Sequence, residues 1–573
     1  MSTSAQGDGD RRTHSRPTTA ELLAEAIRRQ GCTHVFGLMG DGNMHLVIAL
    51  QHRGVEVVEV RHESAAVAMA EGYGWSSGRV GICSVTHGPG LTHTATSLVV
   101  AARNHSPLVV VVAETPAGYA GAQRYDQEAF VAACEATYRR MEPGEDPAAV
   151  LDEVVALAAG TSRPVVLGVA ADLLRSPAAA GDGSSSTAAA PAASPDSRTA
   201  ARAVLDALAG SERPVLIAGR GALAGRTRRL ATAVAEHLGV GLATTLPAKG
   251  MFDGHPLDLG IAGGLAHPAA ERILTDADLV IGVGASMGRS TTQSQRLFRG
   301  ARVLQVVREV AEGADGGQLA GDAEATLEEL HRLVVDGLPG RQPWFAPVGS
   351  AAEEWLPDLR DHAPEVPAGT VDPRPVLLEI SGAIPPDAIV VVSNGHCSGF
   401  VSAFVTAPPA GHFFAAQGFG SIGQALTTAI GVACGAPGRK VVVFEGDAGF
   451  MMHAQEVETA ARAGVDLTVF VLNDQALGTE YQRLLAGGED AQLAIVPPPD
   501  LAVLAGALGA RSAVIPGDDV AVVAAGALRP GLAVVEVRTA RSVLSRHMRL
   551  GEPGQDERAA GRPSRGEQEH AHA

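Results

Sequence analysis

Short runs of almost continuous apolar residues recur along the chain, each separated from the next by longer stretches with helical spacing. Strands that are apolar on both faces are typical of parallel sheets covered by helices on both sides. The pattern therefore predicts an α/β protein built from doubly wound parallel sheets. The clearest predicted strands are residues 55–60, 80–86, 107–113, 213–219, 277–284, 302–307, 387–393, 439–447 and 465–474.

Two segments interrupt this pattern. Residues 176–197 are rich in Ala, Ser, Pro and Gly and lack periodicity, and residues 337–373 contain several prolines. The parts that they separate are each close to a common domain size. We therefore predict three consecutive doubly wound parallel-sheet domains, with a disordered tail at each end. The predicted domains are residues 17–175, 198–336 and 374–545, and the predicted tails are residues 1–16 and 551–573.

Charge and cysteine content exclude several classes of function. The 573 residues include 45 Lys and Arg against 63 Asp and Glu, a formal net charge of −18, which does not suit nucleic acid or an anionic membrane as a partner. The 5 cysteines are scattered without a CxxC pair, as in proteins of a reducing compartment. The N-terminus lacks the apolar core of a secretory signal, and no apolar run approaches the ~20 residues that span a bilayer. We expect a cytoplasmic protein.

Two predicted strands in the third part end in polar residues. One ends at Gly446-Asp447, and the next ends at Asn473, 26 positions after Asp447. Open parallel sheets bind ligands at such strand ends, and carboxylate and amide oxygens suit Mg²⁺. Gly446, Ala448 and Gly449 are small enough for backbone N–H groups to approach a phosphate, and a predicted helix follows with its N-terminus towards the same place.

These segments, EGDAGF and VLNDQALG, resemble the thiamine-diphosphate enzyme family that contains acetolactate synthase, benzoylformate decarboxylase and pyruvate decarboxylase. The family motif is Gly-Asp-Gly, followed after somewhat over twenty residues by Asn or Asn-Asn. In this chain Ala448 stands in place of the third Gly and Asp474 in place of the second Asn. The resemblance implies thiamine diphosphate and Mg²⁺ as cofactors.

The resemblance also implies roles for particular residues of this constellation. Asp447 and Asn473 are expected to bind Mg²⁺ through their side chains, and Gln475 through its backbone carbonyl. The other residues expected to contact the cofactor here are Gly446, Ala448, Gly449, Leu477 and Gly478.

A long match in the first part points to an activating glutamate. Residues 61–73 read RHESAAVAMAEGY, which resembles the family segment that holds the catalytic glutamate, here Glu63. Thiamine diphosphate works as a C2 ylid, and its own aminopyrimidine removes the C2 proton. A carboxyl hydrogen-bonded to the ring nitrogen N1′ promotes the imino tautomer that acts as the base, and burial can raise the pKa of such a carboxyl. Glu63 is therefore expected to contact the cofactor and to act in catalysis.

Residues 415–437 resemble the family segment that bends the cofactor. Ile422 occupies the position of the apolar residue that wedges between the two cofactor rings, and the Gly420 carbonyl the position that accepts a hydrogen bond from the 4′-amino group. Upstream, Gly395 and His396 lie on a loop after a predicted strand, where the family binds diphosphate oxygens.

Three further residues are candidates on the substrate side. Asp41 falls at the position of an aspartate that acts on the substrate in pyruvate decarboxylases, and His87 replaces the Ser of the family turn Thr-Ser-Gly-Pro-Gly. Glu114 stands where the family has a Gln that points into the active site. An acid or imidazole in these places can move protons near neutral pH. Asp41 could equally be a turn residue, and His87 could equally make one structural hydrogen bond.

These observations leave three interpretations. The leading one is a lyase or carboligase that decarboxylates a 2-oxo acid to an enamine and then forms a carbon–carbon bond, like acetolactate synthase. The second is a simple 2-oxo acid decarboxylase that releases an aldehyde, which Asp41 supports. The third, from another class, is a non-catalytic cofactor-binding regulatory subunit.

The resemblance has two further implications. Family members form a homodimer or homotetramer with active sites between subunits, so the same is expected here. Some members also bind FAD in the central domain. The glycine-rich strand end within residues 277–293 could approach a nucleotide, but such a pattern alone is weak evidence for FAD.

Overall fold

The computed structural model describes residues 16–178, 196–310, 317–349, 365–406, 411–516 and 519–550, without residues 117, 119 and 120, together with residues 353–355, 357 and 359. The chain divides into two compact units between Ala188 and Ala189. The predicted tails, apart from Arg16, and residues 179–195 of the first predicted linker lie outside the described residues.

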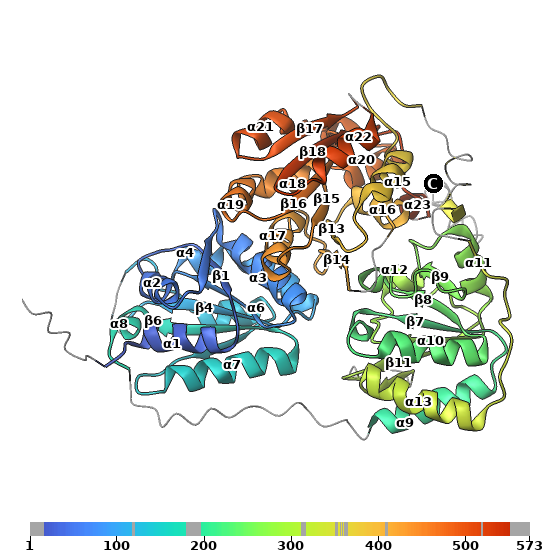
Figure 1. Cartoon of the computed structure of the whole chain (residues 1–573), viewed down its shortest axis with the longest axis horizontal. Coiled ribbons are helices and arrows are strands. Elements are labelled where there is room, and N and C mark those ends of the chain that lie inside the picture. The colour runs from blue at the N-terminus through green and yellow to red at the C-terminus, as the bar shows by residue number, and fades with distance from the viewer. Residues whose placement is uncertain are drawn as a thin grey trace, which may run out of the picture. The chain divides into compact units, whose positions relative to one another are not determined.

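The first unit contains a six-stranded parallel sheet in the order β2-β1-β3-β4-β6-β5. Helices α1 and α7 lie on one side of this sheet and α3 on the other (Figure 1). The strands are β1 (His34–Gly37), β2 (Glu56–Glu59), β3 (Gly81–Val85), β4 (Leu108–Glu114), β5 (Thr137–Arg140) and β6 (Pro164–Ala170). The helices are α1 (Thr19–Arg29), α2 (Met44–His52), α3 (Glu63–Ser77), α4 (Pro89–Thr92), α5 (Ala95–Arg103), α6 (Gln127–Ala133), α7 (Pro147–Thr161) and α8 (Ala171–Arg175).

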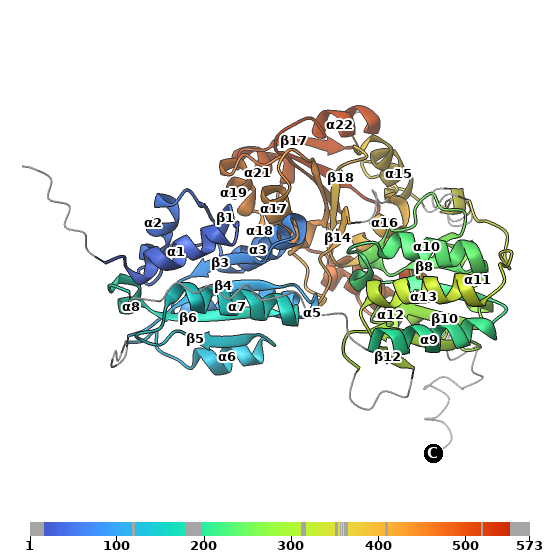
Figure 2. The same cartoon turned by 60° about the horizontal axis from the view of Figure 1, so that its bottom comes forward.

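The second unit contains two more six-stranded parallel sheets, of which the first has the order β12-β11-β10-β7-β8-β9. Figure 2 shows α9, α10 and α13 together on one face of it. Its strands are β7 (Pro214–Ala218), β8 (Gly241–Thr244), β9 (Asp258–Ile261), β10 (Leu279–Val283), β11 (Arg302–Val307) and β12 (Gln318–Ala320). The helices are α9 (Asp196–Ala209), η1 (Arg220–Ala222), α10 (Thr227–Leu238), η2 (Leu246–Ala248), α11 (Pro268–Asp276), α12 (Arg289–Thr292) and α13 (Ala323–Gly337).

The last sheet has the order β14-β13-β15-β16-β18-β17. Its strands are β13 (Ile389–Val392), β14 (Phe413–Ala415), β15 (Val441–Gly446), β16 (Leu467–Asn473), β17 (Arg511–Ile515) and β18 (Ala533–Arg538). The helices are α15 (Pro373–Ala383), α16 (His396–Phe404), α17 (Ala425–Gly435), α18 (Asp447–His453), α19 (Glu456–Arg462), α20 (Gly478–Gly487), η3 (Ala491–Ala494), α21 (Leu501–Ala507), α22 (Val520–Ala527) and α23 (Arg546–Leu550).

The predicted fold class is confirmed, since all three sheets are parallel and helices alternate with strands. The strands of each sheet fall inside one of the three predicted segments, and the domain boundaries themselves stay a prediction. Among the described residues, no helix is long and apolar enough to cross a bilayer. The 5 cysteines are unpaired.

The core of the last sheet fixes the register of β15 and β16. Phe444 pairs with Phe470 across these strands, and their rings stack at 5.4 Å between centroids. Both side chains are fully buried, and burial of each stabilises the fold by roughly 1.5–3 kcal/mol. The same register pairs Gly446 with Leu472. The residues that follow these two strands therefore emerge side by side at the carboxyl edge of the sheet.

A buried lysine joins the last two sheets. Lys249, just after η2, donates from Nζ to the carbonyl of Ser402 at 2.7 Å and to the carbonyl of Val405. These carbonyls belong to the C-terminal turn of α16, where a cation interacts favourably with the helix dipole. Burial lowers the pKa of Lys249 to about 7.

Candidate cofactor and metal site

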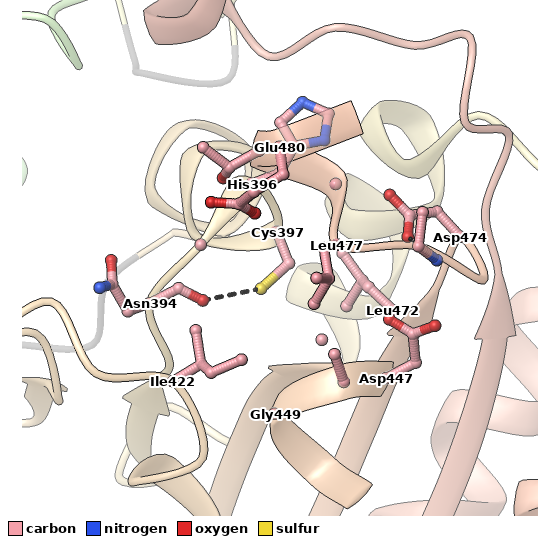
Figure 3. A pocket seen from close by; sticks show the side chains of 16 residues that line it. Asn394, His396, Cys397, Ile422, Asp447, Gly449, Leu472, Asp474, Leu477 and Glu480 are labelled. Carbon is pink, nitrogen blue, oxygen red and sulfur yellow. Dashed lines mark hydrogen bonds between the residues drawn. The ribbon is translucent and has the colours of Figure 1, made fainter. Parts of the chain in front are cut away.

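A pocket of ≈ 440 Å³, part of it open to solvent, lies at the carboxyl edge of β15 and β16 (Figure 3). Its wall comes from the loop after β13, the turn before α17, the start of α18 and the start of α20. The lining residues include Asn394, Gly395, His396, Cys397, Ile422, Gly446, Asp447, Ala448, Gly449, Leu472, Asp474, Ala476, Leu477, Gly478 and Glu480.

Two carboxylates, Asp447 and Asp474, lie in this pocket wall (Figure 3). Burial, and secondly the neighbouring Asp474, raises the pKa of Asp447 to about 7, and burial raises the pKa of Asp474 to about 6. The Oδ2 atom of Asp447 is buried and has no hydrogen-bond partner among the described residues. Two close acidic groups and an unpartnered buried oxygen form a site that a divalent cation would neutralise, and the oxygen donors suit Mg²⁺.

Asn473 and Gln475, the other two predicted metal ligands, do not line the pocket. Asn473 donates from Nδ2 to Glu536 Oε1 at 2.8 Å, and its Oδ1 accepts the N–H of Gln475 at 3.0 Å. The carbonyl of Gln475 accepts the N–H of Val496 at 3.0 Å. The side chain of Asn473 and the carbonyl of Gln475 are therefore engaged within the protein.

The sequence analysis names Asp474 only as a departure from the family motif, whereas the structure brings this residue to the pocket wall. Consecutive side chains of a strand point to opposite faces, so the residue after the end of β16 faces away from Asn473. The alternation of side chains along β16 is the sequence signal for this placement of Asp474. The side chain of Asp474 is held in place by the N–H of Ala476, which donates to its Oδ1 at 3.1 Å.

Glycines let the predicted cofactor loops approach one another. Gly395 has φ 94° and Gly420 has φ 80°, a backbone region that favours glycine. A Cβ at Gly478 would lie 2.7 Å from Asp474 Oδ2, too close for an ordinary contact, whereas a Cβ at Gly395 would lie at a normal contact distance of 3.8 Å from the side chain of Ile422. Figure 3 shows Ile422 pointing into the pocket. Gly420 lies two residues before Ile422, outside the pocket lining.

His396 lines the pocket but its ring is occupied. The Nε2 atom accepts the N–H of Ser545 at 3.2 Å, and the ring packs against Phe400 at 4.8 Å. Burial, with a smaller contribution from His547, lowers the pKa of His396 to about 3, so the ring is neutral at pH 7. The ring is directed away from Asp447 (Figure 3). A diphosphate would thus meet the N-terminus of α16 near Gly395 rather than an imidazolium.

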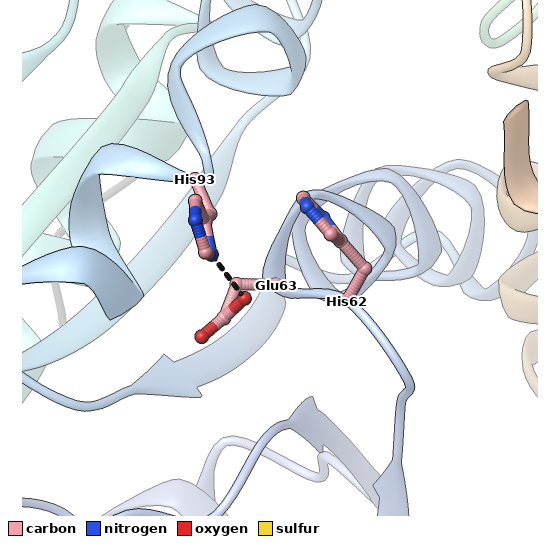
Figure 4. A group of neighbouring side chains, drawn as sticks. All are labelled: His62, Glu63 and His93. Carbon is pink, nitrogen blue, oxygen red and sulfur yellow. Dashed lines mark hydrogen bonds and ion pairs between the residues drawn. The ribbon is translucent and has the colours of Figure 1, made fainter.

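In the first unit, Glu63 begins α3 and is buried. The preceding His62 caps this helix, because its Nδ1 accepts the N–H of Ser64 at 3.2 Å. Glu63 Oε2 lies 2.9 Å from the Nδ1 atom of His93, whose ring stacks on that of His62 (Figure 4). The sequence reasoning had not singled out His93, although it follows the glycine-rich turn that contains His87 by only a few residues.

Asp41 and His87 lie close together in the first unit. Asp41 Oδ1 is 3.9 Å from His87 Nε2, and Nε2 lies 2.8 Å from the side-chain oxygen of Gln123. The Nδ1 atom of His87 is buried and has no hydrogen-bond partner among the described residues. Gly42 makes this packing possible, because a Cβ there would lie 2.4 Å from that atom.

Glu114, by contrast, is held by two partners. Both of its oxygens accept from Arg140 Nε at 3.0 Å, and the hydroxyl of Tyr138 donates to Oε1. Burial and this carboxylate raise the pKa of Tyr138. The arrangement ties β4 to β5 and leaves the carboxylate of Glu114 fully paired.

Comparison with known proteins matches three segments of the chain to three domains of one enzyme family. Residues 17–134 match the N-terminal TPP binding domain of thiamine pyrophosphate enzymes, residues 201–330 the central domain and residues 393–537 the C-terminal TPP binding domain. The chain is 30% identical over 504 residues to a probable 2-ketoarginine decarboxylase of Pseudomonas aeruginosa, covering 85% of this chain and 87% of that protein.

Two other relatives are similar at lower identity. A sulfoacetaldehyde acetyltransferase of Alcaligenes xylosoxydans is 27% identical, with 82% of this chain and 85% of that protein covered. A probable acetolactate synthase large subunit of Methanocaldococcus jannaschii is 25% identical, with 85% of each chain covered.

Proposed function

The chain belongs to the thiamine pyrophosphate enzyme family, whose members act on carbon–carbon bonds, and we propose that it is a Mg²⁺-dependent member that decarboxylates a 2-oxo acid and joins the remaining carbons to a second carbonyl compound. The observation that supports this most directly is the pocket whose wall contains Asp447, Asp474 and the bulky Ile422. Thiamine pyrophosphate, the same compound as thiamine diphosphate, supplies when bound the carbon that attacks the substrate carbonyl.

In this proposal Asp447 and Asp474 hold Mg²⁺, which in turn holds the diphosphate. Asn473 and Gln475 support the loop, because their polar groups are engaged with Glu536 and Val496. Ala476, rather than Gln475, contributes to the pocket wall. The N-terminus of α16 adds backbone N–H groups that favour an anion.

Glu63 is proposed to hold a proton at the pyrimidine nitrogen N1′ of the cofactor. Its burial and its contact with His93 support a role for a fixed carboxylate. We propose that subunits pair as a homodimer or homotetramer and that Glu63 of one subunit serves the pocket of the other. Unpaired cysteines support a cytoplasmic location for this assembly.

A second candidate is a decarboxylase that releases an aldehyde. The pairing of Asp41 with His87 favours it, because a proton donor beside the reacting carbon completes aldehyde formation. Glu114 has no proton-transfer role in either candidate, since Arg140 and Tyr138 occupy its oxygens. A purely regulatory subunit does not fit a chain that matches all three domains of an enzyme family.

FAD is not part of the proposal. The glycine-rich end of β10 is explained by packing, because a Cβ at Gly284 would lie 2.6 Å from the backbone of Gly221. A Cβ at Gly282 would likewise lie 2.9 Å from the side chain of Met287. These glycines permit close packing within the central domain.

The test is a panel of 2-oxo acids, each with and without an aldehyde acceptor, given to the purified protein with Mg²⁺ and thiamine diphosphate. Mass spectrometry of the products is expected to show a ligated hydroxy ketone or hydroxy-oxo acid. Aldehyde as the sole product, in the presence of every acceptor, would establish the second candidate. Calorimetry that shows no binding of Mg²⁺ with thiamine diphosphate would refute both.

A further inference from the structure

A fully buried glutamate, Glu445, lies beneath the pocket near the end of β15. Its Oε1 accepts a hydrogen bond from the hydroxyl of Ser393 at 3.0 Å, and its Oε2 accepts the N–H of Leu426 at 3.1 Å. The backbone N–H groups of Gly423 and Ala425 also hydrogen-bond to this carboxylate. No Lys or Arg forms an ion pair with it in the described part of the chain.

The contacts of Glu445 reach three segments around the pocket. Ser393 immediately precedes the loop that contains Gly395. Gly423 directly follows Ile422 in residues 420–426, here called the wedge turn, which comprise the turn before α17 and the first two residues of that helix. On the metal-binding side, a Cβ at Gly449 would lie 2.9 Å from Glu445 Oε1. Figure 3 shows Ile422 and Gly449 on the same side of the pocket.

The wedge turn needs an external anchor. Gly420 and Gly423 both have positive φ, 80° and 82°, and glycine has more conformational freedom to lose than any other residue. A turn built in this way does not fix the position of Ile422 by its own backbone preferences. The carboxylate of Glu445 accepts hydrogen bonds from the N–H groups that follow Ile422 and so restricts the conformation of the turn.

A fully buried carboxylate is costly for the fold, because its desolvation must be offset by hydrogen bonds. An apolar side chain would fill the same space without that cost. Such a side chain could not, however, accept N–H groups from the wedge turn and the hydroxyl of Ser393 at once. The carboxylate of Glu445 therefore connects the loop after β13 with the wedge turn.

We propose that Glu445 is a positioning residue that fixes the wedge turn, and with it Ile422, relative to the metal-binding and diphosphate loops. The inference rests on the proposed function, since it gives Ile422 the task of bending the cofactor. One carboxylate then sets the position of the wedge turn relative to the loop that holds the metal. Glu445 itself touches neither substrate nor cofactor.

The test compares Glu445→Gln with Ser393→Ala. The amide presents an NH₂ group to a ring of N–H donors, whereas Ser393→Ala removes one donor and leaves the wedge-turn bonds in place. In the protein without cofactor, amide hydrogen exchange of residues 420–426 is expected to accelerate roughly 10–100-fold in Glu445→Gln and to stay at the wild-type rate in Ser393→Ala, as loss of a hydrogen bond to a charged group implies.

A second measurement follows the bound cofactor. Exchange of its C2 hydrogen for deuterium is expected to slow roughly 10–100-fold in Glu445→Gln, while Mg²⁺ affinity stays near wild type because Asp447 and Asp474 are retained. If Glu445→Gln does not fold, both measurements are made on Glu445→Asp, whose carboxylate is withdrawn by one methylene group. Wild-type amide exchange and wild-type C2 exchange in a folded variant would overturn the inference and leave the proposed function standing. Failure of the wild type to bind thiamine diphosphate would instead overturn the proposed function, and the amide exchange test would still be decided.

Discussion

The Nδ1 atom of His93 lies 2.9 Å from the Oε2 atom of Glu63, so one oxygen of this buried carboxylate already has a partner. The ring of His62 stacks on that of His93, with 4.9 Å between the ring centroids, and so restricts its orientation. Among the described residues, no hydrogen bond reaches Oε1 of Glu63. The pair therefore holds the carboxylate in one orientation and leaves Oε1 available for the cofactor contact that we propose for Glu63.

Glu63→Gln is expected to bind thiamine diphosphate with near wild-type affinity and to slow C2 hydrogen–deuterium exchange by ~10²–10⁴-fold, the usual contribution of a positioned proton-transfer group. NMR of quenched samples measures the exchange. Glu71→Gln is a matched control, because Glu71 is a second buried glutamate of α3 whose Oε1 accepts from Asn104 and Ser106. It should lower thermal stability and leave C2 exchange unchanged. Wild-type exchange in Glu63→Gln would remove the glutamate from the mechanism.

His93→Phe is expected to keep the ring stacked on His62 but to release Glu63 Oε2. A hydrogen bond to a charged group contributes about 1.5–3 kcal/mol, so C2 exchange should slow roughly 10–100-fold, less than in Glu63→Gln. Cofactor affinity, measured by calorimetry, should change little. An exchange rate equal to that of the wild type would show that α3 alone orients the glutamate.

Asp447→Asn and Asp474→Ala are each expected to weaken Mg²⁺ binding in the presence of thiamine diphosphate by more than ~100-fold, since loss of even an outer partner of a metal ligand costs ~10–100-fold. Asn473→Ala is the matched control. It should leave Mg²⁺ affinity near wild type and lower the free energy of unfolding by about 1–3 kcal/mol, because Glu536 loses a buried donor. The opposite pattern, with affinity lost in Asn473→Ala and kept in Asp474→Ala, would restore the sequence-based assignment.

The stabilisation by Mg²⁺ is expected to depend on pH. Asp447 and Asp474 have folded-state pKa values of about 7 and about 6, above the ordinary value of 3.8. The metal-free folded protein therefore binds more protons than the unfolded chain between about pH 4 and 7, and the contribution of these groups to stability falls as pH rises through that window. Mg²⁺ competes with those protons, so it should raise the melting temperature more at pH 8 than at pH 5. Equal shifts at both pH values, or an undiminished difference in Asp447→Asn, would argue against this pair.

Asp41→Ala and His87→Ala are expected to slow turnover or change the ratio of aldehyde to ligation product, by up to ~10²–10⁴-fold in the affected step, while C2 exchange stays near wild type. Product analysis with the best substrate of the 2-oxo acid panel measures this ratio. Gln123→Ala serves as a comparison, because it removes the other partner of His87 Nε2. Unchanged rate and product ratio in both Asp41→Ala and His87→Ala would mean that these side chains only shape the loop.

The architecture could be predicted because it is encoded locally. Apolar strands such as β15 and β16 are buried on both faces, and their composition alone predicts a parallel sheet that is covered by helices on both sides. The position of Asp447 followed from the same logic, since it comes directly after a strand. Such features depend on the order of residues within a few positions.

The sequence does not predict which way a side chain points at the end of a strand or which distant residue it meets. Asn473 and Asp474 are adjacent, and only the pairing of Asn473 with Glu536 on β18 assigns the first to the sheet and the second to the pocket. The sequence shows no partner for Glu114, but in the structure Arg140 of β5 donates a hydrogen bond to its carboxylate. His93 and Glu63 are 30 positions apart, and no local pattern joins them. Contacts between distant segments decide these cases.

The buried Lys249 of the central domain caps the C-terminus of α16 and so limits how the two domains can be recombined. Recombination that exchanged the central sheet for one from a distant relative would separate an ammonium from the helix end it neutralises, and the opposite end of that helix forms part of the pocket wall. The two domains must therefore be exchanged together, or a substitution at one side of this contact must be matched by a substitution at the other. In a library of chimaeras, crossovers between them should survive only where the incoming segment brings a lysine to this place.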